Sequence, residues 1–254
     1  MDRAYGPPAA AGPSLRREAA AADQVAAARR DPGRVVLEGA HAVKHALRFG
    51  ADVELITTPD RAGLEALLDA LAPDVALPEG RTVELDPDVW RALVPRELPS
   101  PALAVARRAD VEVTDVLAAP GRVVVLEGPR HLGNLGAVIR VAAAADAGGV
   151  LVLGSADPWH PTAVRAAAGL QFALPVARVD ALPVTDRHLV ALDPGGEELG
   201  HGALAADAVI LVGTERSGLS TELLARADTR ARLPMRTGVS SLNLATAVAA
   251  ALYR

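Results

Sequence analysis

The 254-residue sequence contains no cysteine and very few aromatic residues, which make up only 2% of the chain. The lack of cysteine excludes disulfides, thiolate nucleophiles and cysteine-ligated metals. With so few aromatic rings, the core must pack mainly from Leu, Val and Ala. Lysine is also scarce, because Lys44 is the one lysine among 26 basic residues. We attribute the excess of arginine mainly to genomic base composition, although a guanidinium suits bidentate contacts with phosphate.

The sequence also has no long apolar run. No uninterrupted stretch reaches the ~18 residues expected of a membrane span. The opening residues, Met1-Asp2-Arg3, are followed by Ala and Pro without the apolar core of a signal peptide. We therefore expect a cytoplasmic protein with no membrane partner and no metal. The net charge is −5, so an RNA partner needs a local basic patch because the protein has no general positive field.

Composition and periodicity predict two α/β parts. Residues 1–31 are expected to be a flexible extension that runs into a short helix over Leu15–Arg30. Residues 32–108 read as a compact module of the usual domain size, and residues 109–120 as a linker. The elements predicted in the module are strands at Arg34–Gly39 and Val53–Thr57 and helices at His41–Phe49, Ala62–Ala72 and Pro87–Leu93.

Residues 121–254 alternate regularly between strands and helices. Such alternation predicts a parallel sheet with helices on both faces, and ligands of such sheets bind beyond the carboxyl ends of the strands. The predicted strands are Val123–Leu126, Val150–Leu153, Leu189–Leu192 and Ala208–Val212, and the predicted helices are Asn134–Ala147, Thr162–Ala168, Thr221–Ala227 and Ser241–Tyr253. The loops after these strands carry the informative residues.

The first motif is Leu126-Glu-Gly-Pro-Arg-His-Leu-Gly-Asn-Leu-Gly-Ala-Val-Ile-Arg140, a strand end, a turn and the start of a helix. Asn134 stands where a helix N-cap is expected, since its side chain can accept from a free backbone N–H. Arg140 falls within the first two turns counted from there, so it is expected to project toward the strand ends. Taken alone, this motif is typical of an ordinary capped helix with a surface arginine.

Two further motifs follow later strands. Val212-Gly-Thr-Glu-Arg-Ser-Gly-Leu-Ser220 contains glycines that allow a ligand to approach the backbone, and Glu215 directly after a buried strand. Leu233-Pro-Met-Arg-Thr-Gly-Val-Ser-Ser-Leu-Asn243 places Ser241 and Asn243 at the start of an apolar last helix. Polar side chains that open a buried helix need specific partners. Of the three motifs, the third is therefore the hardest to explain by a purely structural role.

In this order and spacing, the three motifs resemble those of the SpoU (TrmH-like) RNA 2′-O-ribose methyltransferases: N-x-G-x-x-x-R, G-x-E-x-x-G and I/L-P-M-x-G-x-x-S-L-N. The resemblance covers roughly Arg122 to the C-terminus. A weaker similarity, carried by Leu37-Glu-Gly-Ala-His-Ala-Val and Ser100-Pro-Ala-Leu-Ala-Val-Ala, links residues 34–108 to the small RNA-binding domain of the ribosomal-protein L30e type. Two departures are His131-Leu132-Gly133 where many members have Asp-Pro, and Ala167 where many have serine.

The resemblance implies an α/β trefoil-knot (SPOUT) fold, a homodimer and S-adenosyl-L-methionine as cofactor. It implies that backbone groups of Leu192, Gly213, Leu233 and Leu242 bind the cofactor. Arg140 is implied as the catalytic residue for transfer of a methyl group to a ribose 2′-hydroxyl. The residues implied to shape the pocket and to orient Arg140 and the ribose are Asn134, Glu215, Ser241 and Asn243.

Two other functions fit the sequence less well. A dinucleotide-dependent enzyme with the motif G-x-G-x-x-G would need a glycine at position 131, where this sequence has His131. It would also need an acidic residue at the end of a second strand, and the sequence has none at the usual distance. A non-catalytic RNA-binding homologue is disfavoured because all five polar motif residues are present. The N-terminal module favours ribosomal RNA as substrate, while transfer RNA stays open.

Overall fold

The computed structural model describes residues 12–94, 96–214, 217–239 and 241–254. Contacts divide the chain into two compact units. The first comprises the residues up to Ala40 together with Val53–Arg107, and the second comprises His41–Asp52 together with Arg108–Arg254. None of the helices among the described residues is long and apolar enough to cross a membrane.

The first unit is built on a four-stranded sheet in the order β1-β4-β2-β3, in which β4 is antiparallel to β1 and β2. Helix α1 packs into its core through Ala21, Val25 and Ala28, near Trp90. The helix expected over Leu15–Arg30 is thus confirmed as α1, and residues 1–11 lie outside the described chain. The elements are α1 Pro13–Ala28, β1 Arg34–Glu38, β2 Val53–Thr58, α3 Arg61–Leu71, β3 Thr82–Glu84, α4 Pro87–Leu93 and β4 Leu103–Arg107.

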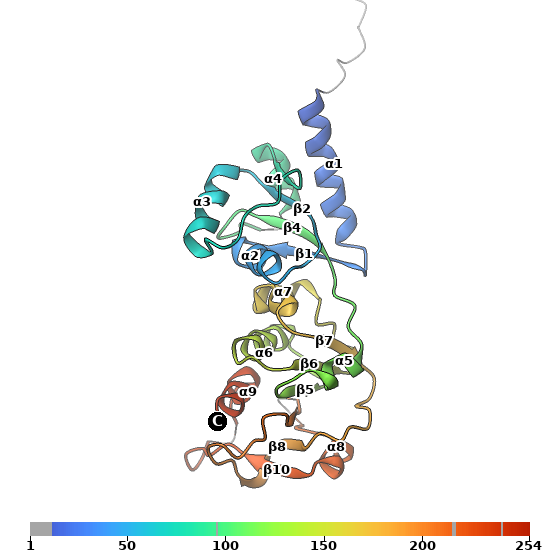
Figure 1. The fold of residues 1–254 in the computed structure, drawn as a ribbon, viewed down its shortest axis with the longest axis vertical. Coiled ribbons are helices and arrows are strands. Elements are labelled where there is room, and N and C mark those ends of the chain that lie inside the picture. Colours follow the sequence, from blue (N-terminus) through green and yellow to red (C-terminus); the bar gives the residue numbers. More distant parts are fainter. Residues whose placement is uncertain (1–11, 95, 215–216, 240) are drawn as a thin grey trace, which may run out of the picture. The chain divides into compact units, whose positions relative to one another are not determined.

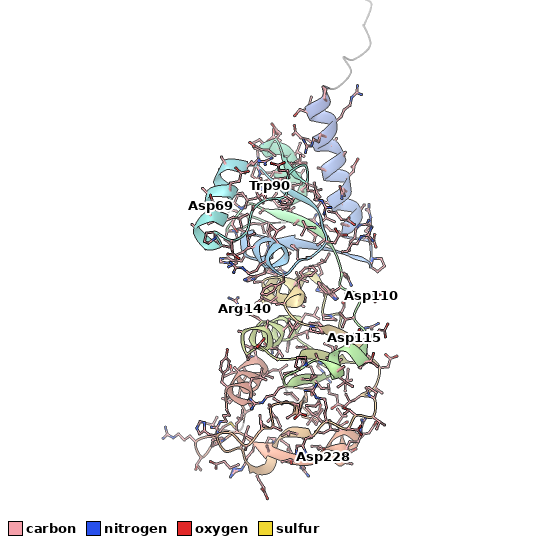
Figure 2. The ribbon with its side chains drawn as sticks, viewed as in Figure 1. Asp69, Trp90, Asp110, Asp115, Arg140 and Asp228 are labelled. Carbon is pink, nitrogen blue, oxygen red and sulfur yellow. The ribbon has the colours of Figure 1, made fainter. Side chains whose placement is uncertain are left out.

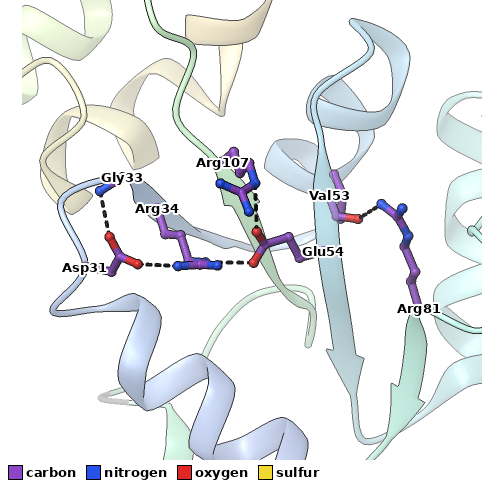
Figure 3. A network of polar contacts seen from close by, with 7 residues as sticks. All are labelled: Asp31, Gly33, Arg34, Val53, Glu54, Arg81 and Arg107. Atoms are coloured by element: carbon purple, nitrogen blue, oxygen red, sulfur yellow. Dashed lines mark hydrogen bonds and ion pairs between the residues drawn. The ribbon is translucent and has the colours of Figure 1, made fainter.

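A polar network joins three strands of this unit (Figure 3). Glu54 on β2 accepts from Arg34 on β1 at 2.7 Å and pairs with Arg107 on β4 at 3.1 Å. Arg34 also pairs with Asp31, whose carboxylate accepts from the backbone N–H of Gly33. That backbone hydrogen bond, together with the one from Arg34, lowers the pKa of Asp31. The network ties the ends of α1, β1, β2 and β4 together.

The second unit contains a six-stranded sheet in the order β10-β8-β9-β5-β6-β7, and every pairing in it is parallel (Figure 1). The α/β prediction with a parallel sheet is therefore confirmed. Its elements are α2 Ala40–Arg48, α5 Val113–Ala118, β5 Val123–Glu127, α6 Leu132–Ala144, β6 Gly149–Leu153, α7 Pro161–Ala167, η1 Leu170–Phe172, β7 Val176–Val179, β8 Leu189–Glu198, β9 Val209–Val212, α8 Thr221–Arg226, β10 Thr229–Arg232 and α9 Leu244–Leu252.

Helices cover both faces of this sheet. Val124 and Leu126 of β5 pack toward α6, α7 and α9, whereas Val123 and Val125 pack toward α5 and α8. Figure 1 shows α6 and α9 along one side of the strands and α5 and α8 along the other. Because successive side chains point to opposite faces, a strand covered on both sides must be apolar throughout, which explains the runs of Val, Leu and Ile in β5, β6 and β9.

Several predicted boundaries were wrong. The segment expected to be a linker, residues 109–120, contains α5, whose Val116 is fully buried. The strands β3, β4, β7 and β10 were not predicted. In β10 the reason is plain, because Thr229–Arg232 carries two arginines and has none of the apolar pattern of a central strand. Helix α6 begins at Leu132 and α9 at Leu244, so neither begins at Asn134 or Ser241.

Candidate active site

A pocket of about 390 Å³ lies in the second unit beside the ends of β8, β9 and β10. This volume is within the range of small-molecule sites. Four segments distant in sequence form its wall: the stretch after Ala191, the loop after β9, the chain from β10 to Met235, and the start of α9. The lining residues are Leu192, Asp193, Pro194, Val212, Gly213, Thr214, Gly218, Ala231, Arg232, Leu233, Met235, Ser241, Leu242, Leu244 and Ala247.

The residues predicted to bind a cofactor meet in this pocket. Leu192, Gly213, Leu233 and Leu242 all line it, although they come from four separate segments. Ser241, predicted as a catalytic residue, lines it as well. Most of the lining side chains are apolar, so a ligand's polar groups must be met mainly by backbone atoms. This arrangement fits a nucleoside whose flat base is held between apolar walls.

The stretch after Ala191 reaches the pocket because β8 is interrupted there. Thr229 and Arg230 of β10 pair with Val190 and Ala191, but the next residue of β10, Ala231, pairs with Glu197. Residues 192–196 therefore leave the ladder and return to it, and we call this segment the β8 excursion. A side chain at Gly196 would approach the backbone of Arg230 to 2.5 Å. Only glycine lets the excursion return so close to β10.

The loop after β9 is folded tightly upon itself. The backbones of Thr214 and Gly218 exchange hydrogen bonds of 3.1 Å, and Gly218 has a positive φ of 65°. A side chain at Gly213 would lie 2.0 Å from the backbone of Gly218. The expected reason for glycine at 213 was room for a ligand, whereas the observed constraint is the loop's own backbone. Glu215 lies outside the described residues.

Glu127, which sequence reasoning missed, joins the loops of the first and second motifs. It ends the buried strand β5, and its carboxylate accepts from the backbone N–H of Ser220 at 2.7 Å. The Ser220 side chain in turn caps α8 by accepting from Leu223 at 3.2 Å. An acidic residue at the end of a buried strand was the signal in the sequence that could have identified it.

The structure brings two predicted catalytic residues into direct contact. The side-chain amide of Asn243 donates to Oδ1 of Asn134 at 3.1 Å. Oδ1 of Asn243 accepts from the N–H of Ala245 at 2.9 Å and of Thr246 at 3.4 Å, so Asn243 is the N-cap of α9. Asn134 was predicted to be an N-cap, but it lies inside the first turn of α6, where His131 occupies the cap position. Asn243 and Ser241 are exposed, whereas the helix that Asn243 caps is largely buried, through Leu244, Ala245, Val248, Ala251 and Leu252.

Arg140 does not line the pocket. It lies in the third turn of α6, about 12 Å along the helix axis from Leu132. Its side chain is exposed, and Figure 2 places it beside α6, well apart from Asp228 next to β10. Counted from Leu132, Arg140 thus lies beyond the first two turns in which it was expected. Gly136 in the same motif serves packing, because a side chain there would lie 2.2 Å from the carbonyl oxygen of Ala163.

The surroundings of Arg140 are positively charged. Helix α2 places His45 so that its Nδ1 lies 2.7 Å from the carbonyl oxygen of Ala168 in α7's C-cap. Burial lowers the pKa of His45, and the positive charges of Lys44, His41 and Arg140 lower it further. Positive charges close to His45 suit an anionic ligand such as an RNA phosphate. Among the described residues, no group of His, Asp and Glu is arranged to hold a metal ion.

Comparison with known proteins gives a consistent result. Residues 121–253 match the model of the SpoU rRNA Methylase family. An uncharacterised tRNA/rRNA methyltransferase of Mycobacterium bovis is 34% identical over 209 residues, which are 75% of this chain and 71% of the relative. The 23S rRNA (guanosine(2553)-2′-O)-methyltransferase of Bacillus subtilis is 28% identical over 86% of each chain.

A solved structure shows the same likeness. The SpoU methyltransferase AviRb from Streptomyces viridochromogenes, in complex with the cofactor AdoMet, superposes with a TM-score of 0.72 at 25% identity. The match covers 91% of this chain and 95% of that one. The likeness thus extends over both units, beyond the residues that the family model matches.

Proposed function

The chain belongs to the SpoU rRNA methylase family, and on that premise we propose that it transfers a methyl group from S-adenosylmethionine to a ribose 2′-hydroxyl of structured RNA. The observation that carries the proposal is the pocket, in which Leu192, Gly213, Leu233 and Leu242 meet from four segments. The solved relative holds AdoMet, and the relative from B. subtilis is named as a ribose 2′-O-methyltransferase.

The pocket fits the cofactor by the chemistry of its wall. Apolar side chains such as Leu192, Leu233 and Leu242 would enclose the adenine, and backbone groups around Gly213 would meet its polar edge. S-adenosylmethionine supplies an electrophilic methyl group on a sulfonium when it is bound. The protein must then align the 2′-hydroxyl with that methyl group, and such positioning contributes ~7–11 kcal/mol in favourable cases.

Arg140 is proposed to act on the 2′-oxygen electrostatically. The hydroxyl must lose its proton as its oxygen bonds to the methyl group, but a guanidinium is a poor base because its pKa exceeds ~12. Fixed positive charge stabilises a developing alkoxide and the adjacent phosphate, and the proton can leave through that phosphate or to water. The cations near Arg140 support this role. Asn134, Ser241, Asn243 and Glu215 are proposed to orient the ribose and the pocket.

We infer a homodimer from the position of Arg140. Its side chain is exposed on α6 and does not line the pocket of its own protomer. A second subunit that brings its own Arg140 to this pocket would complete the site. Sedimentation equilibrium on the full chain would give twice the monomer mass if this is correct. The trefoil knot and the L30e-like character of residues 32–108 stay predictions.

Ribosomal RNA is the proposed substrate, acted on in the cytoplasm. The 23S rRNA enzyme of B. subtilis matches over both units, whereas the M. bovis relative is named for tRNA or rRNA. Because the net charge is −5, RNA binding must depend on local arginines. Mapping 2′-O-methyl groups in the rRNA and tRNA of a deletion strain would identify the substrate, and unchanged methylation of both would contradict the proposal.

Replacement of Arg140 tests the mechanism. Arg140→Ala should abolish methyl transfer but leave affinity for S-adenosylmethionine unchanged, because its proposed target is the ribose 2′-oxygen and the proposed cofactor contacts come from Leu192, Gly213, Leu233 and Leu242. Arg140→Lys should also be largely inactive, since lysine lacks the planar guanidinium. The measurements are single-turnover methylation of RNA and titration calorimetry of the cofactor.

Arg178→Ala is the matched control, because Arg178 is another exposed arginine of the second unit. It should keep full activity. Near-normal turnover by Arg140→Ala would rule out the assigned role. Absence of cofactor binding by the unaltered chain would instead favour a non-catalytic RNA-binding protein.

A further inference from the structure

Asp193 is a charged residue in the wall of an otherwise mainly apolar pocket. It is the second residue of the β8 excursion, so it stands where a buried strand leaves the sheet. Its side chain is only 18% exposed. Among the described residues that line the pocket, Asp193 is the one carboxylate.

Arg230 on β10 holds this carboxylate in place. Nε of Arg230 donates to Oδ2 of Asp193 at 2.7 Å, and Nη2 makes a second, shorter contact with the same oxygen. Oδ1 accepts from the backbone N–H of Gly195 at 3.1 Å. A carboxylate has about four acceptor positions, two on each oxygen. Three are therefore used, and one position on Oδ1 is left.

The carboxylate is ionised in this setting. Burial raises the pKa of Asp193, but the hydrogen bonds from Arg230 and Gly195 outweigh it, so the pKa lies below its usual value. An ionised carboxylate only accepts hydrogen bonds, so the position left on Oδ1 requires a donor. Because Arg230 already neutralises the charge, the group offers a hydrogen bond with little net attraction for a cation.

A second ion pair joins β8 and β10, and it shows whether the pairing of these strands needs a carboxylate that is shielded from solvent. Arg232 on β10 contacts Glu198 on β8 at 3.5 Å, and the Glu198 side chain is 58% exposed. That pair lies largely in solvent, as surface ion pairs commonly do. Pairing of β8 with β10 thus does not require a buried carboxylate. The inward placement of Asp193 is a property of the excursion.

We propose that Asp193 binds a ribose hydroxyl of the adenosyl group, and that Arg230 is the positioning residue that orients it. The inference rests on the proposed function, since it takes the pocket as the cofactor site. A neutralised carboxylate with one remaining acceptor position suits a neutral hydroxyl better than the cofactor's ammonium or sulfonium. Acidic side chains that bind a ribose hydroxyl are also known from dinucleotide-binding sheets.

The test is titration calorimetry on the full chain with S-adenosylhomocysteine and its 2′-deoxy and 3′-deoxy analogues. For the unaltered chain, one of the two deoxy ligands should bind about ten- to a hundredfold more weakly, as expected for loss of a hydrogen bond to a charged group. Asp193→Ala should lower affinity for the parent ligand by a similar factor. Removal of the same hydroxyl should then cost the variant nothing further.

Asp193→Asn provides a second variant of nearly the same shape, and thermal unfolding shows whether each variant is folded. Glu198→Gln is the matched control, because Glu198 itself does not line the pocket although its partner Arg232 does. Its ligand affinities should change much less than those of Asp193→Asn. Arg230→Gln should reduce the preference for the ribose over the deoxyribose ligand, and Arg230→Lys should restore part of it. A merely structural role would not change that ratio.

Four results would overturn the proposal. Equal binding of all three ligands by the unaltered chain would show that no ribose hydroxyl is recognised, while leaving the proposed function intact. An equal penalty for the deoxy ligand in Asp193→Ala and the unaltered chain would assign the hydroxyl to another group. Weaker binding of S-adenosylmethionine but not of S-adenosylhomocysteine by Asp193→Ala would assign Asp193 to the sulfonium. Failure of the unaltered chain to bind either cofactor form would refute the proposed function as well.

Discussion

Asn243 has two roles that its chemistry allows to be separated. Its Oδ1 caps α9 and its amide donates to Asn134, so the residue links the first and third motifs. Ser-x-Asn before a helix indicated that specific partners exist. Asn134 could not be identified as that partner, because the two residues lie 109 positions apart and meet only through the packing of α6 on α9.

We predict that Asn243→Ala destabilises the protein by ~1 kcal/mol, the usual cost of losing a helix N-cap. Asn243→Asp should stay within ~0.5 kcal/mol of the unaltered chain, because a carboxylate still accepts from Ala245 and Thr246 and favours a helix N-terminus. Urea unfolding gives both values. Equal destabilisation of the two variants would show that the bond to Asn134 matters more than the cap.

At the scale of the element, the contact between α6 and α7 depends on a single glycine. Gly136 faces Ala163 of α7 so closely that a side chain would overlap the Ala163 carbonyl oxygen and the Ala166 side chain. Gly133, one turn earlier in the same helix, has no atom within 4 Å of the place of a side chain. The motif N-x-G therefore specifies how closely two helices pack, as well as where the polar residues lie.

These two glycines give a matched pair of variants. Gly133→Ala should stabilise the protein by ~0.5–1 kcal/mol, since alanine is the better helix former and space is available. Gly136→Ala should destabilise it by ~1–3 kcal/mol, the usual range for overpacking, because α6 and α7 must move apart. Thermal and urea unfolding would measure both. A gain in stability from Gly136→Ala would contradict the packing role.

At the scale of the whole molecule, the main question is which unit binds the cofactor and which binds RNA. Every residue that lines the pocket lies in the second unit. From the sequence, the arginines first expected to contact RNA are Arg48, Arg91, Arg107 and Arg108. Three of them have carboxylate partners: Arg91 pairs with Asp88, Arg107 with Glu54 and Arg108 with Asp157. The Arg91–Asp88 pair is exposed on both sides, and such pairs are weak, so a phosphate can replace Asp88 there. The Arg107 side chain is also 61% exposed, although its partner Glu54 is only 16% exposed.

Removal of residues 1–107 should leave cofactor affinity unchanged and remove most of the affinity for RNA. The pocket is retained, whereas the first unit and α2, with its His45 contact to Ala168, are lost. In the full chain, Arg91→Ala or Arg107→Ala should each lower the slope of log K against log salt by ~0.7–0.9 if that arginine contacts a phosphate.

Filter binding at several salt concentrations measures these slopes, and calorimetry with S-adenosylmethionine is the control for the pocket. If the truncated protein methylated full-length RNA as well as the intact chain does, the first unit would have another role. Retained RNA affinity together with lost cofactor binding would show instead that residues 1–107 support the pocket.

Local sequence patterns determined much of this protein. The apolar runs of β5, β6 and β9 revealed strands covered on both faces, and the order of three motifs identified the family, because period and spacing are properties of the chain itself. Polar edge strands escaped this reasoning: β10 contains two arginines and lies at the edge of the sheet, where an apolar pattern is not required.

Tertiary structure alone decided how the motif residues combine. The sequence could not show that Gly213 faces its own loop, that Arg140 lies away from the pocket, or that the β8 excursion turns Asp193 inward. Each of these depends on which distant segments pack together. Pairing between β8 and β10 is set by the whole sheet, and it places residues 192–196 outside the ladder. A side chain's neighbours follow from such long-range packing, for which the local pattern carries no signal.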